Sequence, residues 1–554
     1  MTWEAFFRAD ALAVIASAFV AVYTLLTIVY SLRYMRGRGQ LGRYYACVVL
    51  TAVFSIAAVL SDNLILFMTF WGLLAILLYL LINQGRAERA PQTAKKTFII
   101  IGGTDTLMLL GLAFVWTLAE RPALPHLAMT SVSIPATTPM AAAAYLLLLS
   151  GALAKAGAMP FHTWVPDSAE DAPLPAVAFL PASLDKLVGI YFLLRLNLEM
   201  FALGPAMQGF LMFLGSLTII AGVMMALVQH DLRRLLGYHA VSQVGYMVLG
   251  IGTGIPVGIA GGMFHMLNNT LYKTGLFFAG GAVIHDSGTG DLEKLGGYAR
   301  KMPIVFWTFL VCALAIAGVP PLNGFVSKWM IYQSLVQAGD GGSRLWPLWL
   351  AAALFGSALT LASFVKVLYA VFLAPPKGAV PEKEEASPLL WIPPAILAAA
   401  CVVFGIFAFR LPLRFLVGPV VDMPVLYTGN WHPVVGTILI LLGLAIGAGL
   451  YIAGKVCKTR TVEPFVGGEI LAEQPEMRLS GVDFYETVEK APVLKVVYAA
   501  ALKKAFDMYE LGSRATFGVS KLFSEAHSGE LPTYLVWCLL GMAVLFLMMM
   551  GWAP

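Results

Sequence analysis

The chain has 554 residues, of which 59% are hydrophobic and 12% are charged, and its formal net charge is +5. A soluble globular protein carries about 25% charged residues, so this composition excludes an ordinary soluble domain. The sequence indicates an all-α polytopic membrane protein, without the short alternating strands of a membrane β-barrel. The basic residues fall in loops between apolar runs, so the positive charge does not point to nucleic acid as a partner.

Apolar runs of about 20 residues, the length that a bilayer requires, recur along the chain. We expect about fourteen membrane spans, at 11–33, 43–61, 63–83, 94–119, 139–158, 172–196, 206–229, 232–252, 257–285, 303–333, 346–374, 388–410, 434–455 and 532–552. The first run is followed by Arg33, Arg36 and Arg38. No small-residue cleavage site follows it, so we expect a retained span rather than a signal peptide.

Loop charge predicts the orientation of the spans. The loops at 33–43, 86–96 and 230–234 are basic and fall on one side of the membrane if the span count is correct. Because basic loops stay inside, we expect this side and the segment 456–531 to be cytoplasmic, with both termini outside. The expected location is the inner (cytoplasmic) membrane of a bacterial or archaeal cell.

A break in the apolar pattern occurs between Lys155 and Asp167, where the sequence is KAGAMPFHTWVPD. Proline removes a backbone donor and clashes with the preceding turn, so an unbroken helix is not expected here. The segment GVPPL at 318–322 repeats the break about 160 residues later, with Lys328 nearby. Paired interrupted spans are typical of inverted repeats around a path at the membrane midplane.

The breaks suggest a division of the chain into six parts. We expect N-terminal spans at 1–93, a first repeat at 94–254, a second at 255–375, further spans at 376–455, a polar segment at 456–531 and an anchoring span at 532–554. Residues 492–525 show an amphipathic helical pattern. A single helix of that length would reach about 50 Å and could lie along the membrane against a neighbouring subunit. A linker folded back on this chain is an equally open interpretation.

Ionisable side chains recur inside the spans, roughly one group per helix. The candidates for an ion path are Asp105, Lys155, Asp185, Lys186, His239, His265, Lys273 and Lys328. Charged groups within a bilayer are costly and indicate function by default. A row of them favours a proton relay over a single substrate pocket, because burial and a nearby carboxylate together control whether a lysine holds its proton. Structural ion pairing remains the alternative for each, and it is favoured for Lys366, which no helix break accompanies.

Several of these stretches together resemble the antiporter-like subunits of respiratory complex I. The same family includes subunits of membrane-bound nickel–iron hydrogenases and of Mrp antiporters. The motifs that carry the resemblance are the stretch from Lys155 to Trp164, PLPAV at 173–177, SQVGY at 242–246, FH at 264–265 with Lys273, AGVPP at 317–321 and GFVSK at 324–328. The polar tail with its final span is similar to the large, lateral-helix-bearing member of the family.

The resemblance implies a mid-membrane chain of lysines and histidines with two broken helices. By position, Lys155 corresponds to the lysine of the first broken helix and Lys328 to that of the second. Lys186 and Lys273 correspond to bridging positions, with His265 beside Lys273.

Two departures from the family pattern are visible. The family has a glutamate after the tryptophan of an FWE motif, and here the residues are Phe70, Trp71 and Gly72. Lys155 would then pair with Asp105 or lack a carboxylate partner. The two spans that usually precede the first run of this chain also have no counterpart.

The sequence therefore predicts a proton- or sodium-translocating subunit of a redox-driven membrane complex. No cofactor or metal motif is present, so we expect electron transfer to occur in other membrane subunits. Those partners would be contacted partly through 492–525. The alternatives are an Mrp-type antiporter or inorganic-carbon uptake module without redox partners, and a non-conducting scaffold, which Gly72 favours.

Overall fold

The computed structural model describes residues 6–120, 127–375, 384–421, 433–454, 481–527 and 529–551. Its regular structure is almost entirely helical, as the composition predicts. The polar residues 456–480, which begin the expected cytoplasmic segment, lie outside the described residues. The chain divides into a large unit, Met1–Lys495, and a small unit, Val496–Pro554.

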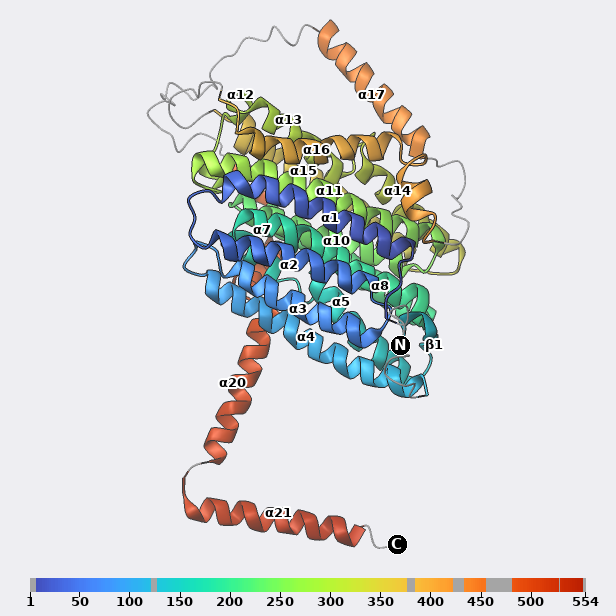
Figure 1. Cartoon of the computed structure of the whole chain (residues 1–554), viewed down its shortest axis with the longest axis vertical. Helices are drawn as coiled ribbons and strands as arrows, with labels where there is room; N and C mark the ends of the chain where they lie inside the picture. The colour runs from blue at the N-terminus through green and yellow to red at the C-terminus, as the bar shows by residue number, and fades with distance from the viewer. Residues whose placement is uncertain are drawn as a thin grey trace. The chain divides into compact units, whose positions relative to one another are not determined.

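The large unit is a helical bundle, in which long helices such as α1, α2, α3, α4, α11, α15 and α16 lie side by side (Figure 1). Its helices are α1 (Ala11–Tyr34), α2 (Leu41–Leu60), α3 (Leu64–Ile82), α4 (Ala90–Leu118), α5 (Pro139–Ala156), α6 (Trp164–Asp171), α7 (Leu174–Phe179), α8 (Asp185–Arg195), α9 (Pro205–Leu227), α10 (Leu232–Gly252), α11 (Pro256–Ser287), α12 (Tyr298–Lys301), α13 (Pro303–Ala317), α14 (Asn323–Asp340), α15 (Trp346–Val367), α16 (Pro388–Ile406), α17 (Pro433–Ala453) and α18 (Glu486–Glu489). Two-residue strands, β1 (Ile134–Pro135) and β2 (Phe201–Ala202), pair in parallel.

The fourteen expected spans coincide with helices. Eleven helical segments in the described residues are long and apolar enough to cross a membrane, including Leu174–Met200, in which α7 and α8 are joined through a π-helical turn. The other three expected spans are α10, α11 and the pair α13–α14. These carry polar side chains or a break, so they fall outside that apolar set. The chain is a multi-pass membrane protein, and the number of crossings stays a prediction.

Helices α10 and α11 form the centre of the large unit. Every residue of α11 from Val257 to Ile284 is buried, and α10 is buried from Leu235 to Gly252. Helix α11 packs against α10, α13, α14 and α16, so its polar side chains face other helices rather than lipid. This is where polar groups inside a membrane are tolerated.

The segment 492–525, which begins at the end of the large unit and continues in the small unit, corrects one expectation. The amphipathic segment 492–525 is not a single helix, because α19 (Pro492–Leu502) ends before α20 (Met508–Ala526) begins. Lys504 adopts a positive φ of 56°, and the amide of Ala505 donates to the carbonyl of Ala500, an arrangement that ends a helix. Asp507 then caps α20 by accepting from the amide of Tyr509. The final helix is α21 (Leu531–Gly551).

Candidate functional site

The two predicted breaks are both present, and they end their helices in the same way. Gly157 follows α5 with a φ of +76°, and Gly318 follows α13 with a φ of +84°. The amide of Ala158 donates to the carbonyl of Leu153 at 2.8 Å, and that of Val319 donates to Leu314 at 3.0 Å. Left-handed glycine with this bond pattern terminates a helix and leaves its last carbonyls without helical partners.

At both helix ends, the Nζ of a buried lysine donates a hydrogen bond to one of these carbonyls. The Nζ of Lys186, on α8, donates to the carbonyl of Ala156 at 3.1 Å. The Nζ of Lys328, on α14, donates to the carbonyl of Ile316 at 2.9 Å. Because the C-terminus of a helix carries partial negative charge, it is a favourable place for a lysine. Each of these lysines therefore binds the end of a helix that a left-handed glycine terminates. Lys155 lies in the last turn of α5, the first of the two broken helices, and its match with Lys328 by sequence position stays a prediction.

Lys155 makes contacts that differ from the predicted ion pair. Its Nζ donates to the carbonyl of Trp71 at 3.1 Å and lies 4.3 Å from the centre of the indole ring. Asp105 instead accepts from the indole nitrogen of Trp71 at 2.8 Å. Among the described residues Lys155 forms no direct ion pair, although the charges of Lys155 and Asp105 act on each other. Trp71 contacts both side chains, and whether Asp105 is the functional partner of Lys155 stays a prediction.

Asp185 is the carboxylate that connects the first two lysines. It is buried at the start of α8, and the charges of both Lys155 and Lys186 act on it. Its Oδ2 has no hydrogen-bond partner among the described atoms. A buried carboxylate oxygen rarely lacks a partner, and such groups call for an explanation in function.

Lys273 continues the row on α11. Its Nζ donates to the carbonyl of Leu236 at 2.8 Å, and the charge of Lys186 acts on it. All four row lysines are at most 2% exposed. The charges of Lys273 and Lys328 both act on His239. His239 therefore interacts electrostatically with both lysines. Its Nε2 is hydrogen-bonded to the hydroxyl of Ser363 at 2.8 Å.

His265 lies next to Lys328, because its ring is hydrogen-bonded to Ser327, the preceding residue, and the charge of Lys328 acts on it. Lys273 follows eight residues later on the same helix, and a joint role of His265 and Lys273 stays a prediction. Its Nδ1 bonds to Ser327 at 2.9 Å and its Nε2 to Gln243 at 3.2 Å. Tyr272 also contacts Nε2 at 3.2 Å.

Sequence reasoning missed several polar partners of this row. They are uncharged residues of α11, α14 and α15, namely Asn268, Ser327, Asn323 and Ser363. The side chains of Asn268 and Asn323 bond to each other at 3.0 Å, and Asn268 also reaches Ser327 at 3.2 Å. The signal that could have found them is the polar triplet Asn268-Asn269-Thr270 inside an otherwise apolar helix.

Some other candidates belong to structural contacts. Lys366 donates to the carbonyls of Leu227 at 2.7 Å and Gln229 at 2.9 Å, where α9 ends. Its structural interpretation therefore agrees with the geometry. Glu170 pairs with Arg234 at 2.6 Å and Arg89 at 3.1 Å.

The comparisons with known proteins show the family and the fold of the chain. Residues 61–360 match the family model described as NADH:quinone oxidoreductase/Mrp antiporter, transmembrane. The chain belongs to this family. The match covers more than half of the chain and contains all eight candidate residues of the row.

A curated relative is the Na(+)/H(+) antiporter subunit A1 of Staphylococcus haemolyticus, 31% identical over 417 residues. The alignment covers 72% of this chain and 52% of the relative, so the chain spans about half the length of the curated relatives it matches.

Solved structures share the fold. A chain of the membrane-bound sulfane sulfur reductase, an archaeal respiratory membrane complex, superimposes with a TM-score of 0.77 at 23% identity, covering 98% of this chain and 89% of that one. A chain of the Mrp complex from a Dietzia species gives a TM-score of 0.69 at 22% identity, covering 75% and 84%.

Proposed function

We propose that this chain carries protons across a membrane through the row Asp105, Lys155, Asp185, Lys186, Lys273, His239, Lys328 and His265. The observation that supports this order is the succession of charge interactions between neighbours in the row. Except for Asp185 and Lys186, which are adjacent on α8, neighbours in the row lie on different helices. Every lysine of the row also donates to a backbone carbonyl.

Unpaired polar atoms mark where water would complete the path. Along the row they are Asp185 Oδ2, His239 Nδ1, Gln243 Nε2 and both side-chain polar atoms of Asn269. Buried waters make about three hydrogen bonds to groups of this kind. We propose that water molecules bridge these atoms and transfer protons between the lysines.

The two equivalent helix ends explain how a lysine could release its proton. At Ala156 and Ile316 the carbonyls stabilise the ammonium form, while complete burial favours the neutral form. The equilibrium between the ammonium and the neutral form of each lysine is therefore sensitive to a neighbouring charge, such as that of Asp185. A change of charge at one end of the row would shift the proton occupancy of the next lysine.

We further propose that the chain works as one subunit of a redox-driven membrane complex. The likeness to a chain of the sulfane sulfur reductase complex covers 98% of this chain, whereas that to the Mrp complex covers 75%, and this difference favours the redox assembly. Sodium in place of protons, and an Mrp-type assembly without redox partners, are the competing functions. Purification of the native complex tests the assembly, and absence of any iron–sulfur or nickel subunit would exclude the redox proposal.

The proton path is tested by Lys328→Met in membrane vesicles, with proton uptake followed by a pH-sensitive dye. The matched control is Lys366→Met, which removes a buried lysine that also binds helix-end carbonyls but lies outside the row. We expect about 100-fold or greater loss of transport for Lys328→Met, since a positioned proton-transfer group typically contributes a factor of this size. Unchanged transport in Lys328→Met would favour the scaffold function.

The orientation of the chain is part of this proposal. The basic loops after α1 and α3 and the start of α10 come together at one end of the large unit, since Arg38, Arg86 and Arg233 line one cavity there. We propose that this end is cytoplasmic, as the positive-inside rule suggests. Accessibility of a single cysteine introduced at Arg43 to an impermeant reagent would test it.

A further inference from the structure

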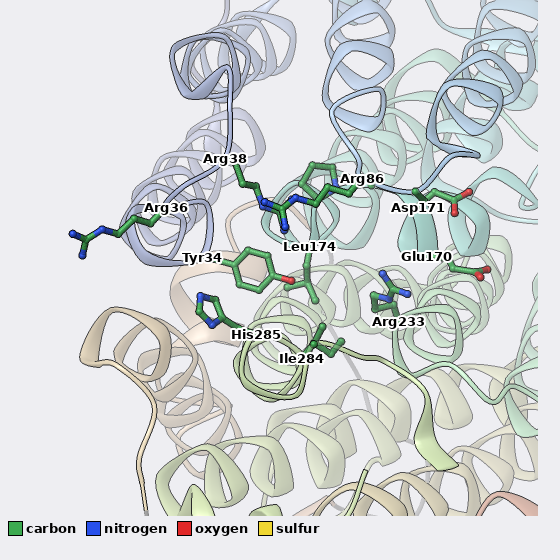
Figure 2. A pocket seen from close by; sticks show the side chains of 14 residues that line it. Tyr34, Arg36, Arg38, Arg86, Glu170, Asp171, Leu174, Arg233, Ile284 and His285 are labelled. Carbon is green, nitrogen blue, oxygen red and sulfur yellow. The ribbon is translucent and has the colours of Figure 1, made fainter. Parts of the chain in front are cut away.

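A basic cavity lies at the end of the large unit where the loops after α1 and α3 meet, and it has no part in the ion path. It has a volume of about 410 Å³ and lies between the ends of α1, α10 and α11, the loops after α1 and α3, and the α6–α7 connection. Figure 2 shows Arg38 and Arg86 beside each other at one edge, with Arg233 at another, while Arg36 points away. Such a volume is in the range of small-ligand sites.

Two of these arginines have no acidic partner. Arg38 and Arg86 form no ion pair among the described residues, although their charges act on each other. Arg38 lies only over the ring of Tyr34, with its Cζ 5.4 Å from the ring centre. Like charges that converge without a counter-ion repel, so the arrangement favours an anion between them.

The carboxylates that line the cavity are engaged elsewhere. Glu170 pairs with Arg89 and Arg234, and Asp171 accepts from the hydroxyl of Thr93 at 2.6 Å. Arg233 is paired with Asp231 at 3.0 Å. The hydroxyl of Thr93 does not neutralise Asp171, so one negative charge stands against the two positive charges of Arg38 and Arg86, and the cavity keeps a net positive charge.

Tyr34 gives a second, independent indication of a ligand. It is only 9% exposed, and its hydroxyl has no hydrogen-bond partner among the described residues. The charges of Arg38, Arg233 and Arg86 all act on this side chain. In Figure 2 its hydroxyl points into the cavity between these groups, where it could donate to an anionic oxygen.

We propose that this cavity binds the phosphate group of an anionic phospholipid. Arginine recognises phosphate through paired, charge-assisted hydrogen bonds, and basic pockets between membrane helices suit acidic headgroups. The cavity is also lined by Leu174 and Ile284, apolar side chains that would contact the glycerol and upper acyl region. Free phosphate shares the charge but would gain nothing from these apolar contacts, which favours the lipid.

The test uses the full chain in its purified complex after removal of bound lipid. Phosphatidylglycerol, phosphatidylcholine and inorganic phosphate are titrated separately, and thermal unfolding is measured, because a ligand that binds the folded form raises the midpoint. We compare Arg38→Gln/Arg86→Gln with the control Arg43→Gln/Lys95→Gln. The control removes the same charge from exposed residues at the same end.

We expect phosphatidylglycerol to raise the midpoint of the wild type and the control, with little effect from the other two additives. The apparent affinity of Arg38→Gln/Arg86→Gln should fall by about tenfold or more, as loss of charged hydrogen bonds implies. Tyr34→Phe, which keeps the ring, should weaken binding less. An equal response of the two double variants would overturn the site, and an equal response to inorganic phosphate would overturn the lipid as its ligand.

Discussion

The side-chain nitrogen of Lys186 lies 3.1 Å from the carbonyl oxygen of Ala156, the last residue of the broken helix α5. Lys328 holds the corresponding end of α13 in the second half of the chain. In each case the lysine comes from a different helix than the one it caps. The same contact can serve as a structural cap or as a site that loads and releases a proton, and the two roles respond differently to substitution.

Lys186→Arg separates these roles. Arginine keeps a donor and a positive charge for the end of α5, but it stays protonated at any accessible pH. We expect folding to be retained and proton transport to fall by about tenfold or more. Lys366→Arg is the control, because Lys366 caps α9 outside the row, and its transport should stay near wild type. Full transport by Lys186→Arg would show that Lys186 is a cap only.

Sequence analysis located the spans and both breaks because these depend on local properties. An apolar run of about 20 residues indicates a span, and glycine with proline indicates a break, without knowledge of the tertiary structure. The prediction of a continuous helix at 492–525 was wrong, because amphipathic periodicity does not register a left-handed residue such as Lys504.

The groups that each lysine and histidine of the row contacts depend on tertiary packing, so they were harder to predict from the sequence. Lys155 contacts a carbonyl of Trp71, 84 positions away in the sequence, and nothing local distinguishes that carbonyl from others on α3. The resemblance placed His265 beside Lys273, which lies eight residues later on the same helix. In the folded chain His239 of α10 occupies the place between Lys273 and Lys328, because α10 packs against α11.

The position of His239 leads to a second prediction. His239→Gln should reduce proton transport more than His265→Gln, since only His239 interacts electrostatically with both Lys273 and Lys328. We expect about tenfold loss for His239→Gln, measured as initial rates in vesicles across a pH series. Ser363→Ala removes the partner of His239 without removing the ring, and it should cost less. Greater sensitivity at His265 would contradict the proposed order.

Gly72 allows a test of the acid at the start of the row. A Cβ built at Gly72 meets no atom within 4 Å, so the backbone can accept a side chain there. We expect Asp105→Asn to lower transport and Gly72→Glu to restore it in the double variant, because a new carboxylate beside Trp71 would act on Lys155. Gly72→Gln in the same background is the uncharged control. Rescue by glutamine as well would mean that charge is not the cause.

The opposite end of α1 carries an ion-pair cluster that predicts how stability depends on pH. Arg195 is 5% exposed and donates to both carboxylate oxygens of Asp10, at 2.6 and 2.7 Å. Burial alone would raise the pKa of Asp10, but the hydrogen bond and charge of Arg195 outweigh it and hold that pKa below its ordinary value. A lowered pKa in the folded state means that the folded form favours the carboxylate.

The stabilising contribution of Asp10 is therefore complete above about pH 4, the ordinary value for aspartate, and is lost as the pH falls through the lower pKa of the folded state. Asp10→Asn should destabilise the folded chain at pH 7 by roughly 1–3 kcal/mol, because it leaves the buried Arg195 without part of its counter-charge. The difference between Asp10→Asn and wild type should shrink as the pH approaches 3, measured by urea unfolding of the solubilised protein. The control is Glu88→Gln, an exposed acid at the other end of the bundle, which should change stability little at either pH. A difference for Asp10→Asn that stays constant from pH 7 to pH 3 would contradict the electrostatic origin and point to lost packing around Arg195.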